Sequence, residues 1–147
     1  MNPELLPKSQ WGHLIPHQGA MCLLDTVVAW DDTRLHARTA SHRRGDNPLR
    51  DGAQLRAVHL AEYGAQAMAV HGALCAQASG GAAQPGFLVS LRGVRFAVQR
   101  IDDLAGDLDV YAEKLLDSGS SWQYAFRIEH NGQIIAEGRA AVMVGAG

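Results

Sequence analysis

The sequence is poor in cysteine and in net charge. Only two of its 147 residues are cysteine, and both Cys22 and Cys75 lie in apolar surroundings without a CxxC spacing. We expect them to be buried free thiols in a reducing cytoplasm. The formal net charge of −2 gives no global attraction for nucleic acid, and no aromatic stacking platform accompanies the arginines. The first residues lack a basic stretch followed by an apolar run, so no signal peptide is expected.

The sequence also lacks a convincing membrane segment. Residues 54–78 are long enough to cross a bilayer, but polar side chains are spread along them and their apolar residues are mainly alanine. Overall, 47% of the residues are hydrophobic and 19% are charged, as in an ordinary soluble protein. A chain of this length predicts one domain over residues 1–147, with residues 1–13 as its N-terminal extension.

Residues 54–78 predict one long, buried helix. Small residues recur there at steps of three and four, which allows close packing, and a helix that is apolar all round is buried. Beyond Arg56, its only formally charged residue is Glu62. An acid in such a helix must be paired, hydrogen-bonded or kept protonated, and such acids are enriched at active sites. Alternatively, Glu62 touches solvent at the edge, or pairs with His59 one turn earlier.

The rest of the chain predicts a sheet around this helix. Apolar runs or alternation typical of strands occur in residues 21–30, 33–40, 87–98, 107–116, 122–130 and 133–144. Asn131-Gly132, between the last two, is the preferred type I′ hairpin turn. This order predicts an α+β hot-dog fold, a curved antiparallel sheet of five to six strands wrapped around one central helix. Because one helix cannot cover both the sheet and itself, at least a dimer is expected.

Three motifs carry a resemblance to a known family. Residues 14–27 read LIPHQGAMCLLDTV, residues 62–69 read EYGAQAMA and residues 86–96 read GFLVSLRGVRF. Together they resemble β-hydroxyacyl-acyl-carrier-protein dehydratases of the hot-dog fold, in motif order and over roughly residues 14–144. The chain is most similar to the predicted 3-hydroxyacyl-carrier-protein dehydratases of aryl polyene biosynthesis clusters.

The resemblance implies dehydration of a 3-hydroxyacyl thioester, on acyl carrier protein or coenzyme A, to a trans-2-enoyl thioester without metal or redox cofactor. This chemistry needs a base and an acid on opposite sides of one C–C bond. Glu62 matches the family acid, and Gln66, one turn on, matches a family glutamine that could orient it. The backbone N–H groups of Arg56 and Ala57, near the helix start, are the candidate donors to the enolate oxygen.

This sequence has no histidine at the position where the family usually has its catalytic histidine. In the fatty-acid dehydratases it lies in an HFPG-like loop fourteen residues before the acid, a position that Pro48 occupies here. His17, in the first motif, is therefore the candidate base, although it could simply be a turn residue. His59 is the rival, and is favoured as a partner that sets the charge of Glu62. The remaining histidines are assigned no role or are expected at the surface or in packing; they are His13, His36, His42, His71 and His130.

Arginines crowd the loop before the helix. Arg43, Arg44 and Arg50 would lie at the mouth of the site, where a basic cluster could steer an acidic carrier protein. Equally, they could pair with Asp46 and Asp51 in a solvated loop.

Two other functions remain open on the sequence alone. A hot-dog acyl thioesterase would use an ionised Glu62 as a general base for hydrolysis. A non-catalytic acyl-binding subunit would pair with an active hot-dog partner, which the missing loop histidine favours. Both a homodimer and a mixed dimer are compatible with the sequence, and in the resembled family the base and acid of one site come from different subunits.

Overall fold

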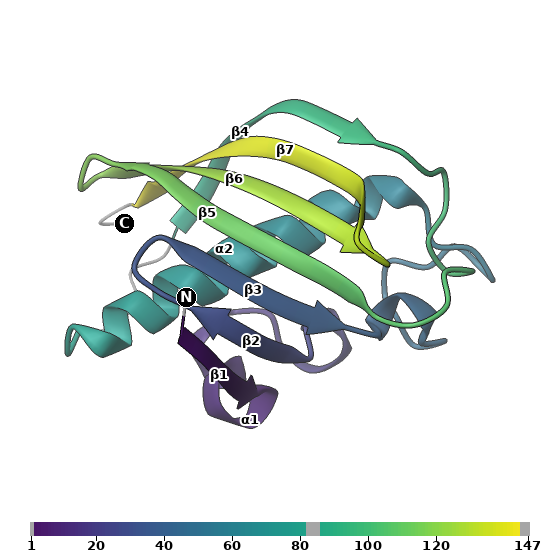
Figure 1. The fold of residues 1–147 in the computed structure, drawn as a ribbon, viewed down its shortest axis with the longest axis horizontal. Helices are drawn as coiled ribbons and strands as arrows, with labels where there is room; N and C mark the ends of the chain where they lie inside the picture. The colour runs from purple at the N-terminus through teal and green to yellow at the C-terminus, as the bar shows by residue number, and fades with distance from the viewer. Residues whose placement is uncertain (1, 82–85, 145–147) are drawn as a thin grey trace.

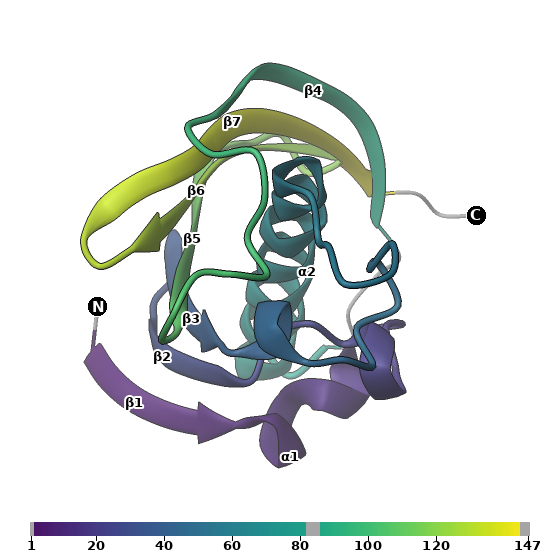
Figure 2. The ribbon, with the colours of Figure 1, turned by 90° about the vertical axis from the view of Figure 1, so that its right-hand side faces the viewer.

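The computed structural model describes residues 2–81 and 86–144, which form one antiparallel sheet around one long helix (Figures 1 and 2). The strands are β1 (Asn2–Pro7), β2 (Thr26–Trp30), β3 (Arg34–Thr39), β4 (Gly86–Phe96), β5 (Leu108–Asp117), β6 (Ser121–His130) and β7 (Gln133–Val144). The helices are α1 (Lys8–Trp11) and α2 (Leu60–Ala78), with 3-10 turns at Gly12–Leu14, Gly19–Met21, Ser41–Arg43 and Ala57–His59. The sheet order is β1-β2-β3-β5-β6-β7-β4, which places β1 and β4 at its two edges.

The hot-dog prediction is confirmed, with two corrections to the elements. The sheet has seven strands, because the N-terminal extension supplies β1, which pairs with β2. The helix begins at Leu60 and not at residue 54. The reason is that the preceding residues bond to another segment: the Ile101 N–H donates to Leu55, and the Ala57 N–H donates to Gln99. A backbone held in such a bridge cannot enter the helix.

The sheet approaches α2 closely at Gly64, as the small residues of the helix predicted, and a glycine of the sheet, Gly138, takes part in the same contact. A Cβ atom at Gly64 would lie 2.6 Å from the ring of Phe126, and one at Gly138 on β7 would lie 2.9 Å from it. Phe126 thus fills a slot that is open only because both neighbours lack a side chain. This packing fixes the first turns of α2, where Glu62 lies, against the centre of the sheet.

The β6–β7 hairpin follows the sequence pattern with one exception. Asn131 and Gly132 both have positive φ angles, 52° and 79°, as the predicted type I′ turn requires. The expected alternation would place Ile134 inside, but Ile134 is 46% exposed and Ile135 is buried. A register shift next to the turn moves the pattern by one residue there.

Among the described residues, no helix is long and apolar enough to cross a membrane. Both cysteines are free thiols; Cys22 is buried and Cys75 is half-buried.

Candidate active site

The loop that carries His17 is pinned on both sides. The buried Ile15 precedes it, and the side-chain amide of Gln18 donates to the carbonyls of Ile15 at 2.8 Å and Gly12 at 3.0 Å. A 3-10 turn, Gly19–Met21, follows directly. His17 is therefore presented by a loop whose own backbone groups hold its shape.

This loop brings His17 to the first turn of α2. His17 Nε2 lies 3.4 Å from Glu62 Oε1, and the two side chains are 27% and 34% exposed. They are 45 positions apart in the sequence, so the fold, and not local sequence, brings them together. A histidine and a carboxylate in contact, both partly open to solvent, can give and take a proton.

Gln66 links Glu62 to the backbone of Met21 and Leu23, in the segment before β2. Its side chain is fully buried. Its Oε1 accepts from the Leu23 N–H at 2.8 Å, and its Nε2 donates to the Met21 carbonyl at 2.8 Å and to Glu62 Oε1 at 3.2 Å. The two backbone contacts fix which end of the amide is nitrogen, so Glu62 Oε1 must accept. The other carboxyl oxygen, Oε2, is then the one available to a substrate.

His17 is less completely bonded than Gln66. Its Nδ1 is buried and has no hydrogen-bond partner in the described part of the chain. A buried ring nitrogen without a partner is unfavourable for stability alone. Such a defect is common at sites where a side chain is kept for its chemistry.

The structure also places Glu62 and the other predicted residues of this site. Glu62 is not deeply buried, because a third of its side chain is exposed. Its partner is His17; His59 makes no hydrogen bond or ion pair with it in the described structure. The Ala57 N–H already donates to the Gln99 carbonyl at 2.9 Å, so it is not a free oxyanion donor in this conformation. Arg56 forms an isolated bridge with Arg100 in the same segment.

The loop arginines are also engaged inside the chain. Arg43 donates to the Gly106 carbonyl at 3.1 Å and lies 3.7 Å from Asp107. Arg50 donates to three loop carbonyls, at 2.8, 3.1 and 3.5 Å. Arg44 forms a short ion pair with Asp25. The alternative partners expected from sequence, Asp46 and Asp51, form no ion pair with these arginines in the described structure.

Sequence reasoning missed a buried polar network beside Glu62. Tyr63 is fully buried, and its hydroxyl bonds to Ser41 Oγ at 2.8 Å and accepts from Asn47 Nδ2 at 3.1 Å. Burial raises the pKa of Tyr63. This network ties the loop after β3 to α2, and the tyrosine directly after the acid was its only signal in the sequence.

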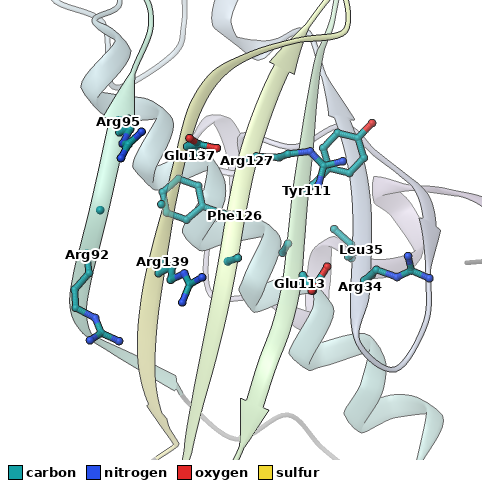
Figure 3. A pocket seen from close by; sticks show the side chains of 14 residues that line it. Arg34, Leu35, Arg92, Arg95, Tyr111, Glu113, Phe126, Arg127, Glu137 and Arg139 are labelled. Atoms are coloured by element: carbon teal, nitrogen blue, oxygen red, sulfur yellow. The ribbon is translucent and has the colours of Figure 1, made fainter.

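A hollow of about 390 Å³ opens beside His17. It is lined by Lys8, Ser9, Gly12, His13, His17, Gln18, Gly19 and Cys22. A larger hollow of about 780 Å³ lies over the face of the sheet that is turned away from α2 (Figure 3), and neither His17 nor Glu62 lines it. The smaller hollow borders His17 but not Glu62.

The curved sheet, its single enclosed helix and this pair define a hot-dog protein with a candidate acid–base site. The family model for ApeP-like proteins, described as ApeP dehydratase, matches residues 9–146. The chain therefore belongs to the ApeP-like dehydratase family.

Solved structures of similar shape agree with this fold. A chain of the dehydratase heterocomplex ApeI:P from Xenorhabdus doucetiae is similar with a TM-score of 0.82 and 24% identity, over 95% of this chain and 91% of that one. Zebra fish thioesterase superfamily member 2 is similar with a TM-score of 0.64 and 14% identity, over 94% and 95%. A hypothetical thioesterase with coenzyme A from Streptococcus pneumoniae TIGR4 has a TM-score of 0.60 and 11% identity, over 81% and 84%. The comparison with curated proteins gave no match.

Proposed function

We propose that this protein converts a 3-hydroxyacyl thioester to a trans-2-enoyl thioester, with His17 as base and Glu62 as acid. The observation that carries the proposal is the 3.4 Å contact between these two side chains in a chain of a dehydratase family. The thioester is carried by acyl carrier protein or coenzyme A, in the cytoplasm, and the pathway is fatty-acid or aryl-polyene-type synthesis.

The proposed reaction follows from how the two groups lie. A ring nitrogen of His17 takes the proton from the carbon next to the thioester carbonyl, and Glu62 gives a proton to the departing 3-hydroxyl. One C–H and one C–O bond break, a C=C bond forms and water leaves. The 3.4 Å contact supports this assignment, because it keeps the two groups close enough to serve the two carbons of one C–C bond. The same contact lets the proton pass from His17 back to Glu62 for the next turnover.

We propose that a second hot-dog subunit completes the protein, as a homodimer, a larger assembly or a mixed dimer. Strand β4 supports this, because it is an eleven-residue edge strand with no neighbour on one side. It also exposes the side chains of Phe87, Leu88, Val89 and Leu91, which are 41–57% accessible. A long, apolar edge strand is a template for pairing with another chain. The similar structure is itself a heterocomplex, which makes a mixed dimer a concrete candidate.

Product analysis tests the proposal. A 3-hydroxyacyl pantetheine thioester is incubated with the wild type, Glu62→Gln and His17→Ala, and the thioester is weighed by mass spectrometry. We expect the wild type alone to remove one water. His13→Ala is the matched control, because His13 is an exposed histidine on the same hollow with no contact to Glu62, and it should retain activity.

The other outcomes name the other functions. Release of free acid would identify a thioesterase, and would contradict the proposed reaction. Binding of the thioester without turnover, alone and with its hot-dog partner, would identify a non-catalytic acyl-binding subunit.

A further inference from the structure

The face of the sheet turned away from α2 carries an ordered set of charged side chains (Figure 3). Two rows cross strands β3, β5, β6, β7 and β4, with directly paired neighbours in each row. The first row is Arg34, Glu113, Ala125, Arg139 and Arg92. The second row is His36, Tyr111, Arg127, Glu137 and Arg95.

Three arginines at one end of these rows, Arg92, Arg95 and Arg139, form no ion pair with any described residue. Arg34 pairs with Asp31, and Arg127 pairs with Glu129. Within residues 2–81 and 86–144, no carboxylate lies within 4 Å of the guanidinium groups of Arg92, Arg95 and Arg139. Arg92 also lies directly opposite Arg139 in the ladder. Like charges in that position destabilise a sheet, so the arrangement is unfavourable for the isolated chain.

A bulge brings the third arginine to this face. Arg92 and Arg95 are three positions apart, so in a regular strand their side chains would point to opposite faces. The β4–β7 register shifts between them, at Gly93, whose φ is +61°. Glycine adopts that conformation without strain, and bulges of this kind re-aim a side chain. The bulge thus brings Arg95 to the same face as Arg92 and Arg139, directly opposite Glu137 in the ladder.

The rows enclose the hollow of about 780 Å³. Gly93, Ala125 and Gly138 are among its lining residues, together with arginines on β3, β4, β6 and β7, whose side chains stand around the hollow in Figure 3. Each row crosses four strand spacings, about 19 Å. That span is too wide for one phosphate or carboxylate and corresponds to about 13 residues of a helix.

We propose that this face binds an acidic protein that presents a row of carboxylates, and that this partner is not a second copy of the chain. The hollow is lined by five arginines and two glutamates, so two copies placed face to face would oppose like charges. Nucleic acid fits less well, because bases need a free aromatic face. The ring of Tyr111 is stacked on His36 at 4.3 Å and covered by Arg127 at 3.9 Å. The surface is separate from the His17–Glu62 site, so the proposal does not depend on the reaction.

A pair of synthetic helices tests the proposal. One is a helical peptide of about 13 residues with glutamate along one side; the other has glutamine at the same positions. Binding to the full chain is followed by fluorescence anisotropy at low and high salt. We expect salt-sensitive binding of the glutamate peptide only, and at least about tenfold weaker binding by Arg92→Glu/Arg139→Glu.

Two controls keep the result interpretable. Arg43→Glu makes the same kind of charge change at another exposed arginine, which pairs with Asp107, and it should bind the peptide as the wild type does. Arg139→Gln should weaken binding while leaving the melting temperature unchanged or raised, because it relieves the repulsion from Arg92. A structural role for Arg139 would lower both together.

Three results would overturn the proposal. The first is no salt-sensitive binding by the wild type, and the second is equal weakening by Arg43→Glu. The third is equal or tighter binding of single-stranded DNA or anionic vesicles with the same dependence on Arg92 and Arg139, which would describe a general polyanion surface.

Discussion

The two halves of helix α2 each present a histidine contact, and the two contacts are built differently. Near its start, Glu62 meets His17 at 3.4 Å, both side chains are about one-third exposed, and His17 Nδ1 has no partner. Further along, His71 is fully buried and both ring nitrogens are bonded, to the Tyr124 hydroxyl and to the Asp31 carbonyl, each at 2.8 Å.

The second contact has a fixed protonation pattern. A carbonyl can only accept, so His71 Nε2 donates to Asp31 and Nδ1 accepts from the Tyr124 hydroxyl. Burial lowers the pKa of His71 and raises the pKa of Tyr124, which keeps both neutral. The comparison indicates that a satisfied buried histidine holds the fold together. His17 is partly exposed and incompletely bonded, which is compatible with the proton exchange that we propose for it.

The largest difference between the His17–Glu62 contact and the His71 contact should be in how their substitution affects turnover. His17→Ala and Glu62→Gln should each lower the rate of dehydration by about 10²–10⁴-fold, because each removes one proton-transfer group. Their free energies of unfolding should change by no more than about 1 kcal/mol, since the contact is partly exposed. Steady-state kinetics and urea unfolding of the same preparations measure both quantities. A large loss of stability with activity kept would place this pair with the structural contacts.

The opposite pattern is expected at the other end of the helix. His71→Ala removes the hydrogen bonds to the Tyr124 hydroxyl and the Asp31 carbonyl together with a buried ring, and should lower the free energy of unfolding by about 2–4 kcal/mol. Turnover per folded molecule should not change. Tyr124→Phe, which removes one hydrogen bond but keeps the ring, is the milder variant and should cost about 1 kcal/mol. Lost turnover in a still-folded His71→Ala would break the comparison.

The two glycines of α2 test how tightly the two halves of the helix pack against the sheet. Gly64→Ala places a methyl group 2.6 Å from the ring of Phe126, and should destabilise the protein by about 1–3 kcal/mol despite better helix propensity. At Gly72 the nearest atom, on the half-buried ring of Trp122, would be 3.1 Å away. That ring can shift, so Gly72→Ala should change stability by less than about 1 kcal/mol. Thermal unfolding of the two variants under the same conditions measures whether their changes in stability differ in sign or size.

The smallest expected effect is a dependence of stability on pH. Burial lowers the pKa of both His71 and His42, so below about pH 6.5 the unfolded chain takes up protons that the folded chain does not. Stability should therefore be constant with respect to these groups above that pH and fall as the pH is lowered through it. The slope is at most about 1.4 kcal/mol per pH unit for each histidine. Urea unfolding of the wild type and His71→Gln should show a shallower decline in the variant.

Much of the fold could be predicted from the sequence because its signals are local. The alternation in β6 and the Asn131-Gly132 turn specify a hairpin without reference to the rest of the chain. The start of α2 could not be predicted in this way. Leu55 and Ala57 are residue types that are common in helices, but their backbone groups form hydrogen bonds with the segment around Ile101.

In the candidate site, too, the features with a local sequence signal could be predicted and those set by long-range contacts could not. Glu62 stands out by its composition, as one charge in an apolar helix, and the motif around His17 indicated the second residue. The sequence could not show that His17 is the histidine in contact with Glu62. That contact depends on Gln66, which holds the loop before β2 through residues more than forty positions away in the sequence. The carrier-protein contact predicted for Arg43, Arg44 and Arg50 stays a prediction, although all three are bonded inside the chain. Among the described residues, arginines without an ion pair lie on β4 and β7.

The central claim is that base and acid of one site belong to one chain, and mixing inactive variants tests it most directly. His17→Ala and Glu62→Gln are co-expressed with different tags, isolated as a mixed assembly and assayed for dehydration. Because each chain lacks half of its own pair, the account predicts no recovery above the single variants. Recovery of a substantial fraction of wild-type activity would mean that base and acid come from different subunits, and would contradict the pairing of His17 with Glu62 in one chain.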